Sequence, residues 1–333
     1  MMKVGVIGGG AWGTALAALS AELGEVVIWA RNADVVAMIN RDHANAAYLP
    51  DVTLPSSLKA TGDLKDLADC GALILAVPAQ SLRDFGAQIA KQLPGPELDS
   101  LAPVVIASKG IEIATGQLPS EVLASVLPNR PLAVLTGPNF ASEVARRLPA
   151  AATLACADQA IGERLMQRLG RPTFRPYFSD DVIGAQIGGA VKNVLAIACG
   201  IVIGRKLGDN ARAALITRGL AEMTRLGLAM GAKRETLMGL SGLGDLVLTC
   251  SGPQSRNLSL GIALGEGKTL PEIMAGRRTV AEGVHTAKAL QVLAKAKSVE
   301  LPICAAVDAI LHHDAAIADM LAALLSRPFK TEA

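Results

Sequence analysis

The chain has 333 residues, 51% of them hydrophobic and 3% aromatic, with a formal net charge of +2. This length exceeds the size at which one hydrophobic core stops growing, so we expect two domains. The basic residues are scattered, which argues against nucleic-acid binding, and the five cysteines are dispersed without a C-x-x-C pair, which indicates a reduced, cytoplasmic protein rather than a disulfide-bonded one.

The first predicted element is a strand over residues 3–7, followed by a glycine-rich turn and a helix over residues 14–23. Strand, G-x-G-x-x-G and helix in this order form the dinucleotide-binding fingerprint. Gly8 would permit the tight turn, Gly10 would let the backbone approach a pyrophosphate, and Gly13 would let helix and strand pack closely. The helix N-terminus would offer free N–H groups to the phosphates. The stretch predicts a bound dinucleotide, and a glycine turn without a ligand is the alternative.

A second strand is predicted over residues 26–30, and no carboxylate stands at its end. An NAD-selective site places Asp or Glu there to bind the ribose 2′-hydroxyl. This chain has Arg31, whose guanidinium can stack on adenine and pair with a 2′-phosphate. Arg31 therefore favours NADP(H) over NAD(H), unless it is an ordinary exposed arginine.

Residues 40–62 are rich in Pro, Ser and Asn, which predicts a loop insertion with at most short strands. Strands and helices then alternate, as in a doubly wound, largely parallel sheet. The predicted strands are 72–77, 104–107, 132–135, 151–155 and 173–177, and the predicted helices are 63–69, 80–93, 118–127 and 159–169. Because such sheets bind ligands beyond the carboxyl ends of their strands, Lys109 and residues 137–139 should face the cofactor. A solvated loop position is the alternative for Lys109.

The longest apolar stretch covers residues 182–204, and its only polar side chains are Gln186, Lys192 and Asn193. An ammonium there loses water, which disfavours its charged form unless a carboxylate or a bound anion compensates. Three interpretations stay open: a membrane span, a buried helix with a structural ion pair, and a core helix with a catalytic or substrate-binding lysine. Five glycines and the central lysine argue against the membrane span.

No strand pattern follows residue 180, which predicts an all-helical second domain. We therefore expect a dinucleotide-binding domain over residues 1–179 and a substrate and catalytic domain over residues 180–333. The further helices are predicted over 210–230 with a cap at Asp209 or Asn210, from 255 to 264, near 280–297, and over 302–326.

Two sites in this second domain carry candidate chemistry. Asp245 lies in an apolar, glycine-rich context, and it is the expected partner of Lys192, because each of two isolated buried charges needs an opposite one. Arg256 and Asn257 follow Ser255 at a helix start, where a guanidinium and free N–H groups can bind a phosphate. A plain helix cap with a surface arginine is the alternative.

The motifs follow one another over essentially the whole chain as GGGAWGTALA, YLPDVTLP, SKG, GPNFA, VKNVLAI, NARAALITRGLAEM, GLGDLVLTC, SRN and AEGVHTA. In this combination the chain resembles the NAD(P)-dependent glycerol-3-phosphate dehydrogenases of the bacterial type. The resemblance implies an α/β Rossmann-type domain followed by an all-α domain like the C-terminal domain of 6-phosphogluconate dehydrogenase. It also implies reversible reduction of dihydroxyacetone phosphate to sn-glycerol 3-phosphate with NADP(H) or NAD(H), a supply of backbone for glycerophospholipids, and a homodimer.

The resemblance also implies roles for single residues. By it, Lys192 is the general acid/base, assisted by Asp245 and Lys109, while Arg256 with Asn257 holds the phosphate. Three further residues fall on substrate-contacting positions, namely Gly137, Asn139 and Ser255. The residues on cofactor-contacting positions are Ala11, Trp12, Arg31, Lys109, Ala141, Arg256, Val280 and Glu282.

Two residues depart from the family pattern: Ala11 replaces a common serine, and Asn139 stands where a small hydroxyl residue is often found. Two other functions stay open. A β-hydroxyacid or 6-phosphogluconate-type dehydrogenase joins the same domain types without needing the SRN phosphate site. A non-catalytic dinucleotide sensor would leave Lys192 and Asp245 without a role. No metal is expected, because the four histidines show no metal-ligand spacing.

Overall fold

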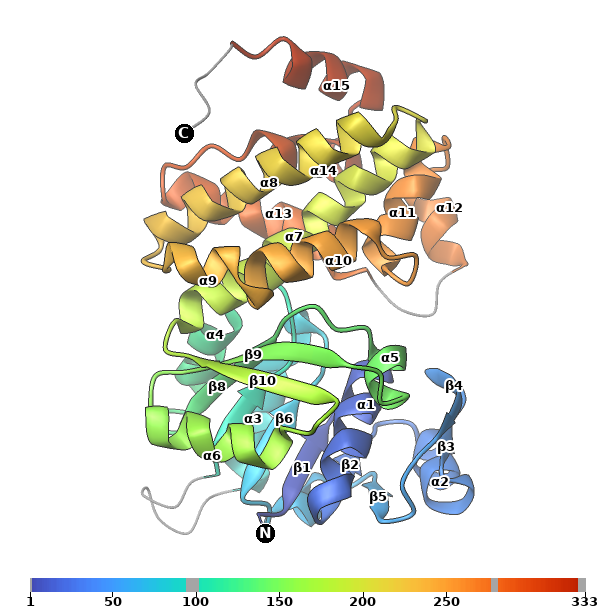
Figure 1. Cartoon of the computed structure of the whole chain (residues 1–333), viewed down its shortest axis with the longest axis vertical. Helices are drawn as coiled ribbons and strands as arrows, with labels where there is room; N and C mark the ends of the chain where they lie inside the picture. The colour runs from blue at the N-terminus through green and yellow to red at the C-terminus, as the bar shows by residue number, and fades with distance from the viewer. Residues whose placement is uncertain (1, 94–101, 277–280, 329–333) are drawn as a thin grey trace.

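The protein consists of a sheet-containing half and a helical half, with helix α7 (Val182–Gly204) leading from the first into the second (Figure 1). The computed structural model describes residues 2–93, 102–276 and 281–328. The last strand, β10, ends at Ser179, and every regular element described after it is helical. The order of a sheet half and then a helical half is the one predicted.

An eight-stranded sheet forms the centre of the first half, in the order β10-β9-β8-β7-β6-β1-β2-β5. The six strands from β8 to β5 are parallel, in the strand order of a doubly wound dinucleotide-binding sheet. β9 runs antiparallel to β8, and β10 is parallel to β9. The strands are β1 (Val4–Ile7), β2 (Val26–Trp29), β5 (Leu58–Thr61), β6 (Ala72–Leu75), β7 (Val104–Ile106), β8 (Leu132–Thr136), β9 (Ala150–Cys156) and β10 (Phe174–Ser179). The prediction of a doubly wound, largely parallel sheet is confirmed.

The inner strands β1, β6 and β7 are buried on both faces of the sheet, and successive side chains of each strand point to opposite faces. Val6 and Ile74 belong to one hydrophobic cluster, whereas Ile7, Leu73 and Leu75 belong to the cluster on the other face. Parallel strands covered on both faces are continuously apolar, as the fully buried β1 and β6 are. The helices of this half are α1 (Ala11–Ser20), α2 (Ala33–Asp42), α3 (Leu82–Gln92), α4 (Pro119–Val126), α5 (Ala141–Ala145) and α6 (Gln159–Leu169), with short 3-10 turns η1 (Ala21–Leu23), η2 (Leu64–Leu67) and η3 (Ala79–Ser81).

The segment 40–62 contains more regular structure than the predicted loop insertion. Strands β3 (Ala44–Asn45) and β4 (Leu49–Thr53) form a small hairpin, and β5 adds to the edge of the main sheet beside β2. Within β5 only Leu58 is buried, so its sequence lacks the apolar run of the inner strands. Pairing with β2, rather than a local pattern, makes this segment a strand.

Helix α7 is the central element of the second half, and its residues 184–202 are all buried. The helices packed around it are α8 (Asp209–Ala229), α10 (Asp245–Ser251), α11 (Arg256–Gly265), α13 (Glu282–Ala296) and α14 (Pro302–His312). α7 is long and apolar enough to cross a bilayer, but 89% of its most apolar window lies inside the protein. The structure therefore supports a core helix over a membrane span.

Glycines allow α7 and α11 to approach each other at backbone distance. A Cβ atom on Gly200 would lie 2.2 Å from the Leu258 carbonyl oxygen, and one on Gly261 would lie 2.0 Å from that of Ile197. Small residues at a helix crossing let two backbones meet. The glycine content of α7, unusual for a helix, thus reflects close packing.

Two helix predictions need correction, and one further stretch forms helices that were not predicted. The helix predicted over residues 302–326 is divided into α14 and α15 (Ile317–Leu325), with Asp314 at φ +51° between them. α8 begins at Asp209, and Gly208 rather than Asp209 or Asn210 precedes it as the cap. The glycine-rich stretch before Asp245 forms α9 (Arg234–Met238) and the π-helical turn η5 (Leu240–Gly244), which α10 continues. α12 (Leu270–Ala275) completes the described helices.

Candidate active site

A buried cluster of three charges lies where the two halves meet. Lys192 Nζ lies 2.5 Å from Oδ1 of Asp245, and Lys109 Nζ lies 2.6 Å from Oδ2 of the same carboxylate. Lys192 also donates to Thr249 Oγ1 at 2.8 Å. Asp245 is completely buried, so its negative charge is balanced by the two ammonium groups, and Thr249 Oγ1 also donates to its Oδ1 at 3.3 Å. The pairing predicted between Lys192 and Asp245 is present, and Lys109 joins it.

Four separate segments place these side chains. Lys192 lies near the middle of α7, and Asp245 is the first residue of α10. Thr249 lies one turn after Asp245 on the same helix face. Lys109 comes from the segment after β7 and also donates to the carbonyl oxygen of Gly137, after β8, at 3.0 Å. The carboxyl ends of β7 and β8 therefore contribute to one site with α7 and α10, and Lys109 is not a solvated loop lysine.

The electrostatics of the cluster bring the pKa of Lys192 close to neutral pH. Burial and the positive charge of Lys109 together lower the pKa of Lys192 to about 8, against the opposing effect of Asp245. A proton donor works best when its pKa lies near the operating pH. Lys192 can therefore both give and take a proton, while Asp245 holds its amine in place.

The glycine turn before α1 divides into positions that the protein itself fills and one that it leaves open. A Cβ on Gly8 would lie 2.5 Å from the Ala76 carbonyl oxygen, and one on Gly13 would lie 1.9 Å from that of Gly8. A Cβ on Gly10 would meet nothing within 4 Å. Gly10 also precedes α1 without a side-chain cap, so the first N–H groups of the helix can bind an external acceptor. The turn fits a dinucleotide pyrophosphate.

The remaining cofactor candidates of the first half surround this turn. Gly9 packs against Ala30, since a Cβ on Gly9 would lie 2.6 Å from the Ala30 Cβ, and the exposed Arg31 follows directly. The indole Nε1 of Trp12 is buried without a partner among the described residues. Ala11 and Ala141 are the first residues of α1 and α5. Val280 lies outside the described residues.

Glu282, the first residue of α13, reaches from the helical half to the sheet. Its Oε1 accepts from the N–H of Ala79, beyond the end of β6, at 3.3 Å. Its Oε2 is buried and has no partner in the described part of the chain. Burial raises the pKa of Glu282, against the Ala79 N–H and the charge of Arg256. Strand order reverses between β1 and β6, the position where such sheets bind dinucleotides, so the unpaired oxygen fits a ligand donor.

In the SRN motif, Ser255 caps α11 and Asn257 connects this helix to its neighbours. Ser255 Oγ accepts from the N–H of Leu258 at 3.2 Å and caps α11. The Asn257 side chain donates to Asn193 Oδ1 at 2.9 Å and accepts from the N–H of Gly283 at 3.0 Å. Asn257 thereby joins α7, α11 and α13. Its amide is engaged within the protein, which its predicted role as a phosphate ligand did not anticipate.

Asn139 lies near the charge cluster but makes a structural contact. Its Nδ2 donates to the Ala151 carbonyl oxygen at 3.0 Å, and its Oδ1 is buried without a partner among the described residues. The amide therefore links the turn after β8 to β9. A small hydroxyl at this position could not make the same bridge from its shorter side chain.

Sequence reasoning missed Thr249, the pairing of Asn193 with Asn257, and the contact of Glu282 with Ala79. Only Thr249 had a local signal, because it lies four residues after Asp245 on a helix. In the described ranges no three His, Cys, Asp or Glu residues form a group that could hold a metal ion.

Comparisons with known proteins cover nearly the whole chain. The family described as NAD-dependent glycerol-3-phosphate dehydrogenase matches with its N-terminal part over residues 3–162 and its C-terminal part over residues 181–322. A glycerol-3-phosphate dehydrogenase [NAD(P)+] of Parvibaculum lavamentivorans is 56% identical over 99% of this chain and 98% of its own. That of Caulobacter vibrioides is 55% identical over 99% of each chain. A crystal structure of glycerol-3-phosphate dehydrogenase from Coxiella burnetii superposes with a TM-score of 0.92 at 39% identity, over 98% of this chain and 99% of that one.

Proposed function

Since the chain belongs to the NAD-dependent glycerol-3-phosphate dehydrogenase family, which interconverts dihydroxyacetone phosphate and sn-glycerol 3-phosphate, we propose that Lys192 is the proton donor and acceptor of this reaction. The observation that carries the proposal is the pairing of Lys192 and Lys109 with one fully buried carboxylate, Asp245. A buried titratable group with a perturbed pKa and a specific charge partner is typical of a catalytic site.

In the reducing direction the substrate carbonyl oxygen gains negative charge, and the Lys192 ammonium stabilises that charge and donates the proton. The bound nicotinamide supplies the hydride. In the reverse direction the neutral Lys192 amine takes the proton of the hydroxyl group. Asp245 keeps the amine oriented, and Lys109 holds the other oxygen of that carboxylate. General acid catalysis by one such group contributes about 10²–10⁴-fold in rate.

The substrate phosphate would bind at the N-terminus of α11. Arg256 is the first residue of this helix, and a guanidinium and the free N–H groups of a first helical turn are both suited to a phosphate. The Asn257 amide donates one N–H to Asn193 and accepts from Gly283. We assign the phosphate contact at Asn257 to its backbone N–H, which lies in the first turn of α11. Binding remote from the reacting carbon fixes the reactive geometry. Gly137, Asn139 and Ser255 would line the substrate site.

The dinucleotide would lie across the carboxyl ends of β1 and β6. The glycine turn and the start of α1 would bind its pyrophosphate, with the Ala11 N–H in place of a hydroxyl donor. Arg31 would hold the adenosine end and favour a 2′-phosphate, hence NADP(H). The other contacts of the dinucleotide would be with Trp12, Lys109, Ala141, Arg256, Val280 and Glu282.

Three wider parts of the proposal concern the setting of the enzyme. All five cysteines are unpaired thiols, which supports a reducing, cytoplasmic location. There the product would supply the backbone of glycerophospholipids. A homodimer is supported by α15, whose sequence IADMLAALL is almost wholly apolar although none of its residues is buried.

The test is oxidation of NADPH and NADH, measured side by side with dihydroxyacetone phosphate as acceptor, for the unmodified chain and for Lys192→Ala. We expect turnover with the unmodified chain and a loss of about 10²–10⁴-fold in kcat in the variant. The variant should still bind the dinucleotide, as measured by fluorescence titration. Near-normal kcat in Lys192→Ala would contradict the role of Lys192. Turnover only with unphosphorylated hydroxyacids would favour a hydroxyacid dehydrogenase, and no turnover at all a dinucleotide sensor.

A further inference from the structure

We propose that Arg83 and Glu112 are positioning residues for the reaction, because they fix the segment that carries Lys109. Residues 107–118 connect β7 to α4 without a helix or strand of their own, and Lys109 lies near the beginning of this segment. An irregular segment of this length needs contacts with its surroundings to hold one conformation. The inference rests on the roles proposed above for Lys109 and Lys192.

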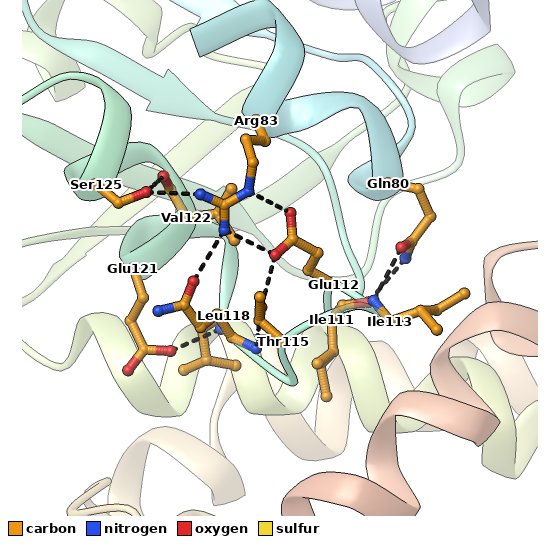
Figure 2. Close-up of polar contacts among 11 residues, drawn as sticks. Gln80, Arg83, Ile111, Glu112, Ile113, Thr115, Leu118, Glu121, Val122 and Ser125 are labelled. Atoms are coloured by element: carbon orange, nitrogen blue, oxygen red, sulfur yellow. Dashed lines mark hydrogen bonds and ion pairs between the residues drawn. The ribbon is translucent and has the colours of Figure 1, made fainter. Parts of the chain in front are cut away.

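The backbone around Lys109 is attached to the segment after β6 at two places. On one side, Ser108 Oγ donates to the Val77 carbonyl oxygen at 2.5 Å. On the other side, the Gln80 amide donates to the carbonyl oxygen of Ile111 at 2.8 Å and accepts from the N–H of Ile113 at 3.0 Å (Figure 2). The Gln80 contacts lie on either side of Glu112.

The Glu112 side chain is held by a polar network centred on Arg83 (Figure 2). Arg83 Nε donates to Glu112 Oε1 at 3.0 Å, and Arg83 Nη2 donates to Oε2 at 2.8 Å. The same guanidinium reaches Gln117 Oε1 at 3.0 Å and Ser125 Oγ at 2.9 Å. Thr115 Oγ1 adds a bond to Glu112 Oε2 at 2.6 Å. One arginine of α3 thereby connects both ends of the turn 112–117 to α4.

This pair differs from an ordinary surface ion pair, which contributes little. Glu112 is only 8% exposed, and its pairing with Arg83 is bidentate, the geometry in which Arg binds a carboxylate most strongly. The Arg83 guanidinium lowers the pKa of Glu112, so the carboxylate is charged. Without Arg83, a buried charge three residues from Lys109 would lose its partner. Glu112 would then take up a proton or move toward water. Either change breaks the bidentate contact that holds the segment, and Lys109 would lose its fixed position.

The first experiment compares kcat and KM of Arg83→Ala, Arg83→Lys and Glu112→Gln. Because a displacement of about 1 Å can cost about 10²-fold in rate, we expect kcat to fall by about 10- to 100-fold in Arg83→Ala and Glu112→Gln. Arg83→Lys should recover part of the loss, since lysine restores the charge but not the bidentate geometry. The matched control is Glu300→Gln, which removes an exposed Arg–Glu pair, Arg327 with Glu300 at 2.9 Å, and should keep kcat within about twofold.

A double-mutant cycle separates positioning from general weakening of the fold. If Arg83 acts through Lys109, Arg83→Ala should cause no further loss of kcat in a Lys109→Met background. Multiplying losses would overturn the proposal, as would wild-type kcat in Glu112→Gln. The cycle compares the effect of Arg83→Ala on kcat in the wild-type and Lys109→Met backgrounds. A loss of stability caused by Arg83→Ala would be present in both backgrounds.

The pH profile gives a readout that a purely structural role would not change. The charged or titratable groups that act on Lys192 are Asp245, Lys109 and the thiol of Cys250. Since the charge of Lys109 lowers the pKa of Lys192, both Lys109→Met and Arg83→Ala should move the alkaline limb of the reduction profile to higher pH. An unmoved limb in Arg83→Ala, while Lys109→Met shifts it, would refute the positioning role. Wild-type kcat in Lys192→Ala would instead remove the catalytic role on which the inference rests.

Discussion

The glycine turn at residues 8–13 and helix α7 are both rich in glycine, but the space beside those glycines is filled differently. In α7 a Cβ on Gly200 would strike the backbone of α11 at 2.2 Å, whereas a Cβ on Gly10 would meet nothing within 4 Å. The glycines of α7 are needed for packing within the protein. Gly10 is not, so the space beside it is available to a ligand.

The two regions also differ in how they present charge. The turn offers backbone N–H groups and the positive end of a helix dipole, which need no side-chain charge. α7 instead carries Lys192, whose charge depends on the single carboxylate of Asp245. The cofactor region should therefore tolerate side-chain changes that the catalytic region does not.

The largest expected effect tests the charge cluster. Asp245→Asn leaves two lysine ammonium groups without their carboxylate, and removing one partner of a buried ion pair costs about 3–5 kcal/mol in the free energy of unfolding. Urea titration with circular dichroism measures it. The control is Asp69→Asn, which removes the exposed partner of Lys3 and should cost about 0–1 kcal/mol. Equal losses in the two variants would show that the buried Asp245 ion pairs contribute no more to the free energy of unfolding than an exposed pair does.

A matched pair of substitutions tests the contrast between the glycines. Gly200→Ala forces a methyl group against the Leu258 carbonyl oxygen and should lower the free energy of unfolding by about 1–3 kcal/mol. Gly10→Ala meets no protein atom and should leave that free energy within about 0.5 kcal/mol, while raising KM for the dinucleotide. Thermal unfolding and steady-state kinetics measure both variants. An unchanged KM for the dinucleotide in Gly10→Ala would show that the dinucleotide does not occupy the open space beside Gly10.

The pH dependence tests the state of Lys192. Reduction needs the ammonium form, and burial lowers the pKa of Lys192 to about 8. kcat for reduction should therefore be highest below that pH and should fall about tenfold per pH unit well above it. Oxidation needs the neutral amine and should show the opposite trend. Rates in both directions between pH 6 and 10 measure it, and flat profiles across that range would argue against Lys192 as the titrating group.

The smallest effect is expected at the exposed end of the cofactor region. Arg31→Asp replaces a candidate 2′-phosphate partner with a carboxylate that would repel it and could bind a ribose hydroxyl. The ratio of kcat/KM for NADPH to that for NADH should fall, with little change in stability because Arg31 is exposed. An unaltered ratio would remove Arg31 from the 2′ site. Arg175, exposed on β10, offers an Arg175→Asp control away from the turn.

Local patterns in the sequence determined much of the fold and part of the site. Continuous apolar runs predicted the inner strands, and α6 was predicted with its observed bounds because its caps and periodicity are local. The glycine spacing predicted the turn before α1, and the isolated charges of Lys192 and Asp245 predicted each other, because a buried charge needs a partner. By contrast, β5 carries too few apolar residues to be identified without β2.

Tertiary structure alone decided which groups that are distant in the sequence contact each other. Lys109 takes the second oxygen of Asp245, Asn257 is engaged with Asn193, and Glu282 reaches Ala79. These contacts join residues 64 to 203 positions apart in the sequence. Backbone and side-chain preferences act over a few residues, so they specify where helices and strands form. Which side chains meet is decided when those elements pack, because the bonding capacity of a buried polar atom is filled by whichever group the packing brings within reach.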